Sequence, residues 1–149
     1  MKKRVLIVAL SGCLLTLLLA AGAYAQLPGA PLRANIPFDF TVRGKTLPAG
    51  EYEFRRITDE PGGLEVLNIH RSHEHTMFET EPVDKGNIAR HGEIVFHRYG
   101  DTYFLYEVWT AGLETGRELP ASKQERYLRS ETASNTGPSE PQTVAIAVY

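Results

Sequence analysis

The stretch EIVFHRYGDTYFLYEVWT, residues 93–110, decides the fold because β-branched and aromatic side chains lie on both sides of one glycine. Such side chains suit the pleated, half-buried surface of a sheet, so the stretch predicts a β-hairpin. The interpretation that best separates apolar from polar residues is a three-residue loop of Arg98, Tyr99 and a left-handed Gly100. One face then carries the core residues Ile94, Phe96, Phe104, Tyr106 and Val108. The other carries Glu93, Val95, His97, Asp101, Tyr103, Leu105, Glu107 and Trp109.

A two-residue loop at Gly100 and Asp101 is the alternative register. It moves one strand by a single residue and mixes Arg98 and Glu107 with core positions. A shift of one residue sends every side chain of a strand to the opposite face, so the register decides both the core and the candidate site. The hydrophobic pattern favours the three-residue loop.

Residues 1–25 have the order of a secretory signal peptide. Three basic residues follow Met1, an uncharged apolar run covers residues 5–22, and Ala23-Tyr24-Ala25 offers an A-x-A site, which predicts cleavage before Gln26. One alternative is an uncleaved anchor, because the apolar run approaches the roughly 20 residues that span a bilayer. Another is lipidation at Cys13 in Leu10-Ser11-Gly12-Cys13, but the apolar run continues well past that cysteine.

Composition limits the classes of protein that fit. Cleavage leaves residues 26–149, of a size for one β domain, with 13 basic and 18 acidic residues and a formal charge of about −5. No basic patch for nucleic acid is present, and a membrane contact is predicted only through the signal peptide. Cys13 is the sole cysteine, so the exported domain has no disulfide and depends on packing for its stability.

The remaining chain reads as short strands separated by turn residues. Residues 35–42 alternate strictly, and Pro37 places that strand at an edge or a bulge because proline cannot donate to a sheet ladder. A turn at Arg43-Gly44-Lys45 precedes a strand over 51–58, and further strands are expected over 64–71 and 76–82. Together with the hairpin, this spacing predicts an antiparallel sandwich or a partly closed barrel.

The C-terminal part changes period. Residues 121–129 predict a short helix with Pro120 at its first position and an i,i+4 pair between Glu125 and Arg129. Residues 131–141 are rich in Ser, Thr, Asn, Gly and Pro and predict a flexible connector. Residues 143–149 alternate again and predict a last strand that covers an open sheet edge. The expected fold is all-β, with about seven strands and one short helix near the C-terminus.

Two blocks of this sequence resemble a family of small exported bacterial β-domain proteins with no assigned activity. They are NIPFDFTVRGKTLPAGEYEF, residues 35–54, and VFHRYGDTYFLYEVWTAGLETGRELPASKQERYL, residues 95–128. The second block is the more specific, since LPAGEY-like segments occur in many unrelated β-sandwich domains. The resemblance implies an exported single β domain and brings no catalytic residues with it.

Three histidines, His70, His73 and His75, form the first candidate site, because imidazole is a common ligand of transition metals. Their H-x-x-H-x-H spacing matches no strong site pattern, and a fourth ligand would have to come from Glu74, Glu79 or elsewhere. A solvated polar turn is the favoured interpretation, so the sequence predicts no metal and no cofactor.

The less apolar hairpin face is the second candidate site. His97 with Asp101 or Glu107 would suit acid–base chemistry, and Tyr103 with Trp109 would stack on a flat ligand. Arg117, in a glycine-containing segment after Trp109, would fix loops or receive an anion. No G-x-S-x-G or H-E-x-x-H motif is present. The sequence therefore favours an exported non-enzymatic module that binds a small molecule or an envelope partner, and the alternative is a small secreted enzyme or metal-binding protein using His97, Asp101 and Glu107.

Overall fold

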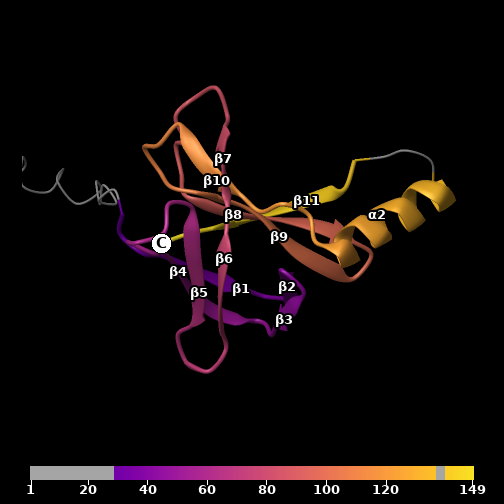
Figure 1. The fold of residues 1–149 in the computed structure, drawn as a ribbon, viewed down its shortest axis with the longest axis horizontal. Helices are drawn as coiled ribbons and strands as arrows, with labels where there is room; N and C mark the ends of the chain where they lie inside the picture. Colours follow the sequence, from indigo (N-terminus) through magenta and orange to yellow (C-terminus); the bar gives the residue numbers. More distant parts are fainter. Residues whose placement is uncertain (1–28, 137–139) are drawn as a thin grey trace, which may run out of the picture.

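The computed structural model describes residues 29–136 and 140–149, which form two sheets and one helix (Figure 1). The four-stranded sheet has the order β1-β4-β5-β6, and the seven-stranded sheet has the order β11-β8-β9-β10-β7 with β2 and β3 attached beside β9. The predicted all-β sandwich is confirmed, and the two sheets do not close into a barrel within the described ranges. The predicted signal peptide, residues 1–25, lies outside those ranges.

The described chain has more strands than the sequence predicts, because alternating segments continue around corners. The strands of the first sheet are β1 (Leu32–Ile36), β4 (Gly50–Arg56), β5 (Gly63–Asn68) and β6 (His75–Glu79). Those of the second are β2 (Phe40–Val42), β3 (Lys45–Leu47), β7 (Glu81–Asp84), β8 (Glu93–Tyr99), β9 (Thr102–Trp109), β10 (Thr115–Glu118) and β11 (Gln142–Ala147).

Two predicted strands are each divided between the sheets. The segment 35–42 leaves the first sheet at Ile36 and enters the second at Phe40, with Pro37 in the corner. As expected from Pro37, β1 is an edge strand. The segment 76–82 divides at Thr80, whose backbone N–H and hydroxyl both donate to the Gly62 carbonyl at 3.0 and 2.6 Å. Both corners tie one sheet to the other.

The hairpin of β8 and β9 has the alternative register at its turn. Tyr99 pairs with Thr102, so the loop is Gly100-Asp101, and the predicted three-residue loop is wrong. Gly100 is left-handed as predicted, with φ 60°, and it occupies the first loop position, where a type II′ turn requires glycine. A β-bulge follows: Phe96 faces Leu105 while Val95 faces Glu107, which leaves Tyr106 as the extra residue.

The bulge redistributes the predicted core residues. Ile94, Phe96 and Val108 lie in the core as expected, joined by Leu105 and, at the margin, by Tyr103. Phe104 pairs with His97 and therefore belongs with Tyr106 on the outer face of the seven-stranded sheet. The three-residue loop predicted Phe104 and Tyr106 on the core face and Tyr103 and Leu105 on the opposite face. The structure reverses the faces of all four residues, so the prediction is wrong for them.

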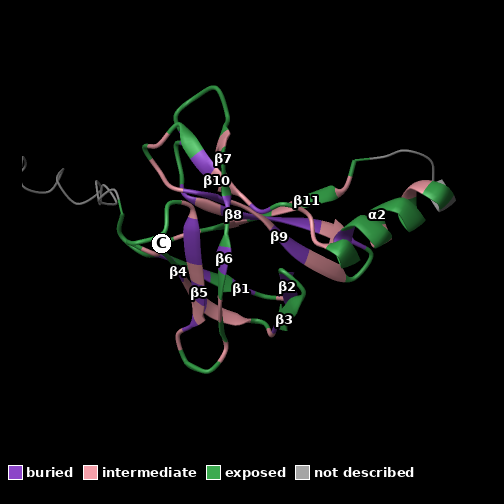
Figure 2. Ribbon diagram, in the orientation of Figure 1, coloured by how far each residue is buried: buried purple, intermediate pink, exposed green. Residues whose placement is uncertain are grey.

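The main core fills the space between the sheets (Figure 2). Phe40 packs edge-on against Tyr52 of the first sheet and Phe96 of the second, at ring-centre distances of 5.0 and 5.4 Å. The Tyr52 hydroxyl is satisfied by donating to the Pro48 carbonyl at 2.7 Å. A smaller apolar cluster on the outer face contains Ala89, Val95 and Trp109. The sandwich is therefore filled, and any ligand site must lie at its ends or on its outer faces.

Strand β11 confirms the prediction for residues 143–149. It pairs antiparallel with β8 from Gln142 to Ala147 and so covers the outer edge of the hairpin. The chain then reaches the other sheet, where the Tyr149 N–H donates to the Arg33 carbonyl at 3.0 Å.

Helix α2 (Lys123–Thr136) is longer than the sequence predicts and begins later. Ser122 caps it by accepting a hydrogen bond from the Glu125 N–H at 3.1 Å, so Pro120 is not its first residue. The predicted connector is wrong for 131–136, which are helical, while 137–139 lie outside the described residues. Much of α2 is exposed (Figure 2). None of the helices in the described part of the chain is long and apolar enough to cross a membrane.

Candidate functional site

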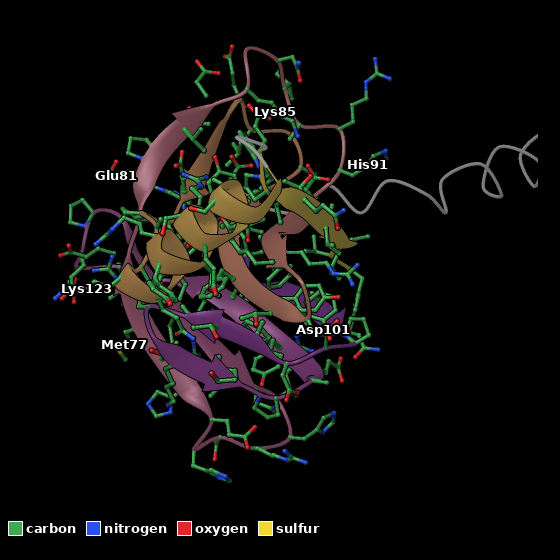
Figure 3. The ribbon with its side chains drawn as sticks, turned by 90° about the vertical axis from the view of Figure 1, so that its right-hand side faces the viewer. Met77, Glu81, Lys85, His91, Asp101 and Lys123 are labelled. Atoms are coloured by element: carbon green, nitrogen blue, oxygen red, sulfur yellow. The ribbon has the colours of Figure 1, made fainter. Side chains whose placement is uncertain are left out.

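Polar side chains converge in a cleft of about 380 Å³ between α2, the outer face of the seven-stranded sheet and the segment entering β11. Figure 3 looks at this side of the molecule and shows α2 lying across the front of the strands. Residues that line the cleft include His97, Tyr106, Glu118, Glu125, Arg129 and Thr143. They come from four strands, β8, β9, β10 and β11, and from the helix, so the tertiary fold assembles the cleft.

His97 and Glu125 join the sheet to the helix. The His97 Nδ1 lies 2.7 Å from the Glu125 Oε1, and both side chains are more than nine-tenths buried. Because a carboxylate oxygen accepts, Nδ1–H is the donor. Ser122 and Glu125 have the spacing of a capping box, in which the glutamate turns back to the cap. Here its carboxylate is directed to His97 instead, so the predicted pair between Glu125 and Arg129 is wrong.

Tyr106 forms one wall of the cleft. Its ring stacks on the His97 imidazole with ring centres 3.7 Å apart and planes 23° from parallel. Burial raises the pKa of the Tyr106 phenol to about 12, and the neighbouring Glu107 charge adds to the shift. The phenol is therefore neutral at physiological pH. Since Tyr106 is the extra residue of the bulge, the bulge itself aims this ring at His97.

Three carboxylates lie in a row across neighbouring strands at the cleft margin. Glu118 of β10 pairs directly with Glu81 of β7 on one side and with Glu107 of β9 on the other. Burial raises the pKa of Glu118, and the charges of Glu107 and Glu81 raise it further, against an opposing effect of His97. Like charges in directly opposed positions are unfavourable, so the row of carboxylates is an unfavourable arrangement that a positive group beside Glu118 would relieve.

Tyr99 is buried beside α2, and Arg129 is an exposed residue of that helix. Tyr99 is 8% exposed, and its hydroxyl has no hydrogen-bond partner in the ranges 29–136 and 140–149. Burial raises the pKa of Tyr99, with an opposing effect of the nearby Arg129 guanidinium and a further increase from the Glu125 charge. Arg129 and Tyr99 also line an adjoining hollow of about 510 Å³ near the hairpin turn. The underside of α2 is therefore loosely filled beyond the contact between His97 and Glu125.

The structure separates the residues predicted for the hairpin site. Asp101 is fully exposed in the turn, 3.9 Å from the Arg98 guanidinium, and it does not line the cleft. Tyr103 lies at the core margin, where its ring stacks on Phe38 at 3.8 Å. Of the three residues in the alternative enzyme hypothesis, only His97 lines the cleft. The Glu107 carboxylate instead accepts a hydrogen bond from the Trp109 indole N–H at 2.8 Å. The set His97, Asp101 and Glu107 is not brought together.

Trp109 is packed rather than available for stacking. It is 2% exposed, and a Cβ at Gly116 would lie 2.6 Å from its ring. The Lys85 ammonium lies 4.9 Å from the ring centre. The tryptophan therefore belongs to the outer apolar cluster, and the prediction that it contacts a ligand finds no open ring face to support it.

Arg117 lies on strand β10, where it pairs with Val108, and not in a loop. Adjacent strand residues face opposite ways, so Arg117 is directed between the sheets and its neighbour Glu118 lies on the outer face with the cleft. The sequence prediction thus named the residue next to the one that lines the cleft.

The three candidate metal ligands have separate partners. The Nε2 of His70 lies 3.1 Å from Glu51, the Nδ1 of His75 lies 3.0 Å from the Ser72 carbonyl, and His73 is largely exposed near Glu74. Among the residues with described positions, no three His, Cys, Asp or Glu side chains are grouped to hold a metal ion.

Sequence reasoning missed Tyr106 as an outer-face residue, and it missed Glu118, Glu125 and Arg129. The capping-box spacing of Ser122 and Glu125 was a visible signal for the helix start. Comparison of the chain with protein-family models, with curated proteins and with solved structures gives no match. The resemblance of residues 35–54 and 95–128 to an exported family therefore stays a prediction.

Proposed function

We propose that this chain is an exported, non-enzymatic β-sandwich module that binds a small cationic ligand in the cleft beneath α2. Export rests on the predicted signal peptide of residues 1–25. The observation that carries the ligand class is the position of Glu118, which lies between Glu81 and Glu107 and lines the cleft.

A bound cation would relieve an unfavourable arrangement. The raised pKa of Glu118 reflects burial and two neighbouring carboxylates, and no lysine or arginine makes an ion pair with Glu81, Glu107 or Glu118 among the described residues. A positive group near Glu118 supplies the missing charge. The partly buried Tyr106 ring lines the cleft beside it and offers apolar surface, which suits an amine with a small apolar body.

The geometry favours binding over catalysis. His97 is engaged by Glu125 at 2.7 Å and covered on one face by Tyr106, so its Nδ1 is committed to holding the helix. The other two residues of the alternative enzyme hypothesis lie elsewhere, Asp101 at the hairpin turn and Glu107 against Trp109. This supports a site that holds its ligand by charge and shape.

Isothermal titration with two molecules of matched shape tests the proposal. Phenethylamine carries a positive charge, and 3-phenylpropionate carries a negative charge on a similar body. We expect the amine to bind the mature domain and the carboxylate not to bind. Glu118→Gln should weaken amine binding about tenfold, as loss of a charged hydrogen bond does. The matched control is Glu114→Gln, an exposed acid outside the cleft. Equal binding of both molecules, or an unchanged affinity in Glu118→Gln, would overturn the proposal.

A further inference from the structure

A second charged feature lies at the end of the sandwich, between the two sheets. Arg56 is the last residue of β4 in the four-stranded sheet, and Arg117 lies on β10 in the seven-stranded sheet. Both line a hollow of about 350 Å³ and a smaller one beside it. The two sheets therefore bring two guanidinium groups to one opening.

Neither arginine has a protein counter-ion in the described part of the chain. The other arginines of the first sheet are paired: Arg33 with Glu53 at 3.0 Å, and Arg55 with Glu65 at 2.7 Å. Within the described ranges, the Arg56 and Arg117 side chains have no carboxylate at ion-pair distance and make no hydrogen bond. Glu60 lines the hollow too, without reaching ion-pair distance to either. Partial burial and the positive charge of Arg56 lower the pKa of Arg117. The two guanidinium groups therefore repel each other, and no protein carboxylate in the described ranges offsets that repulsion.

The floor of the hollow is a firmly held turn. Ile57 N–H donates to the Gly63 carbonyl at 3.0 Å, and Gly63 N–H donates to the Glu60 carbonyl at 2.9 Å. Gly62 has φ +94°, and a Cβ there would lie 2.7 Å from the Thr80 carbonyl and 3.9 Å from Arg117. The absence of a side chain at Gly62 thus keeps the space beside the Arg117 guanidinium open.

From this placement we infer that Arg56 and Arg117 form a binding site for a phosphate group. Two planar guanidinium groups present forked pairs of N–H donors, which match the oxygens of a tetrahedral oxyanion. An oxyanion between them would neutralise both charges at once. The hollow is larger than one phosphate ion, so the group fits either free or carried on a small molecule. Because the predicted mature chain is acidic, with a formal charge of about −5, its overall field does not attract anions and the local pair must do so.

Titration with inorganic phosphate, followed by isothermal calorimetry at constant ionic strength, tests this site. We expect saturable binding to the mature domain, with affinity lowered about tenfold or more in Arg56→Ala and in Arg117→Ala. Arg55→Ala is the matched control, because Arg55 neighbours Arg56 but is paired with Glu65. A second titration with glycerol 3-phosphate distinguishes the sources: tighter binding than inorganic phosphate indicates that the group is carried on a larger molecule.

Arg56 is exposed at a strand end, so its alanine variant is expected to fold even if Arg117→Ala does not, and thermal unfolding by circular dichroism checks both. The absence of saturable phosphate binding would overturn the inference. So would equal loss of binding in Arg55→Ala and Arg56→Ala, because that result indicates attraction to surface charge in general. These outcomes are independent of amine binding beneath α2.

Discussion

The buried contact between His97 Nδ1 and Glu125 Oε1, 2.7 Å long, attaches helix α2 to the sheet. The rest of the helix is largely exposed, including the Tyr127 ring, so little apolar burial holds it. Both residues also line the cleft beneath α2, so we expect this contact to hold the helix in place above it.

Replacing Glu125 with alanine should therefore loosen α2. The change leaves the buried His97 donor without its acceptor, which costs about 1–3 kcal/mol of unfolding free energy. Urea denaturation measures the loss, and amide hydrogen exchange should rise along α2. Glu131→Ala, an exposed position on the same helix, is the control and should change stability by less than about 0.5 kcal/mol. Equal stability of the two variants would show that the contact does not anchor the helix.

Glu118→Gln should stabilise the protein at neutral pH while weakening amine binding. The pKa of Glu118 in the folded chain is raised above its ordinary value of 4.5, so the folded state holds this proton more tightly than the unfolded state. Stability consequently falls as pH rises through the interval between the two pKa values, and the cost is fully present above the folded pKa. The urea midpoint of Glu118→Gln should exceed that of the wild type at pH 7, and the difference should vanish below pH 4.5. A difference that grows on acidification would contradict this sign.

Gly116→Ala should disturb Trp109. A Cβ at this position would lie 2.6 Å from the indole ring, which is closely packed and held by its hydrogen bond to Glu107. Overpacking of this kind costs about 1–3 kcal/mol. Trp109 is the only tryptophan, so its fluorescence reports the change directly, alongside urea denaturation. The exposed neighbour Thr115→Ala should lose less stability and leave the emission unchanged; matching spectra in the two variants would speak against close packing at Gly116.

If the proposed signal peptide is removed as predicted, the mature protein should begin at Gln26. N-terminal sequencing of protein recovered outside the cytoplasm of an expressing bacterium checks this expectation. The double substitution Ala23→Leu and Ala25→Leu removes the small side chains of the cleavage site. It should leave the signal peptide attached. A mature chain starting at Met1 would indicate an anchor, and one starting at Cys13 would indicate lipidation.

The alternation of apolar and polar residues was sufficient to predict most strands. This two-residue period can be read from a single segment without knowing which strand pairs with it. It was not sufficient at Pro37 and Thr80, where the apolar pattern continues although the chain passes to the other sheet. The hairpin register failed for a related reason. The predicted pairing assumed that the hairpin has no bulge. The bulge at Tyr106 allows the hairpin to combine a two-residue turn with an apolar core face.

The site was predictable only in part. His97 was identified from its place on the less apolar hairpin face, but its partner Glu125 lies 28 residues away on a helix whose docking depends on tertiary packing. Arg117 was predicted to lie in a loop. It lies instead on strand β10, where neighbouring residues face opposite ways, so Glu118 and not Arg117 faces the cleft. The three carboxylates of Glu81, Glu107 and Glu118 become neighbours only when three strands pair.

Chemical-shift mapping of phenethylamine on the isotope-labelled mature domain tests the central claim most directly. Binding in the cleft predicts saturable shifts confined to the backbone amides of His97, Tyr106, Glu118, Leu119 and Thr143, all of which line it. The same titration of Glu118→Gln should require about tenfold more amine for equal shifts. Shifts spread over exposed acidic residues, or confined to the hairpin turn at Asp101, would contradict a binding site beneath α2.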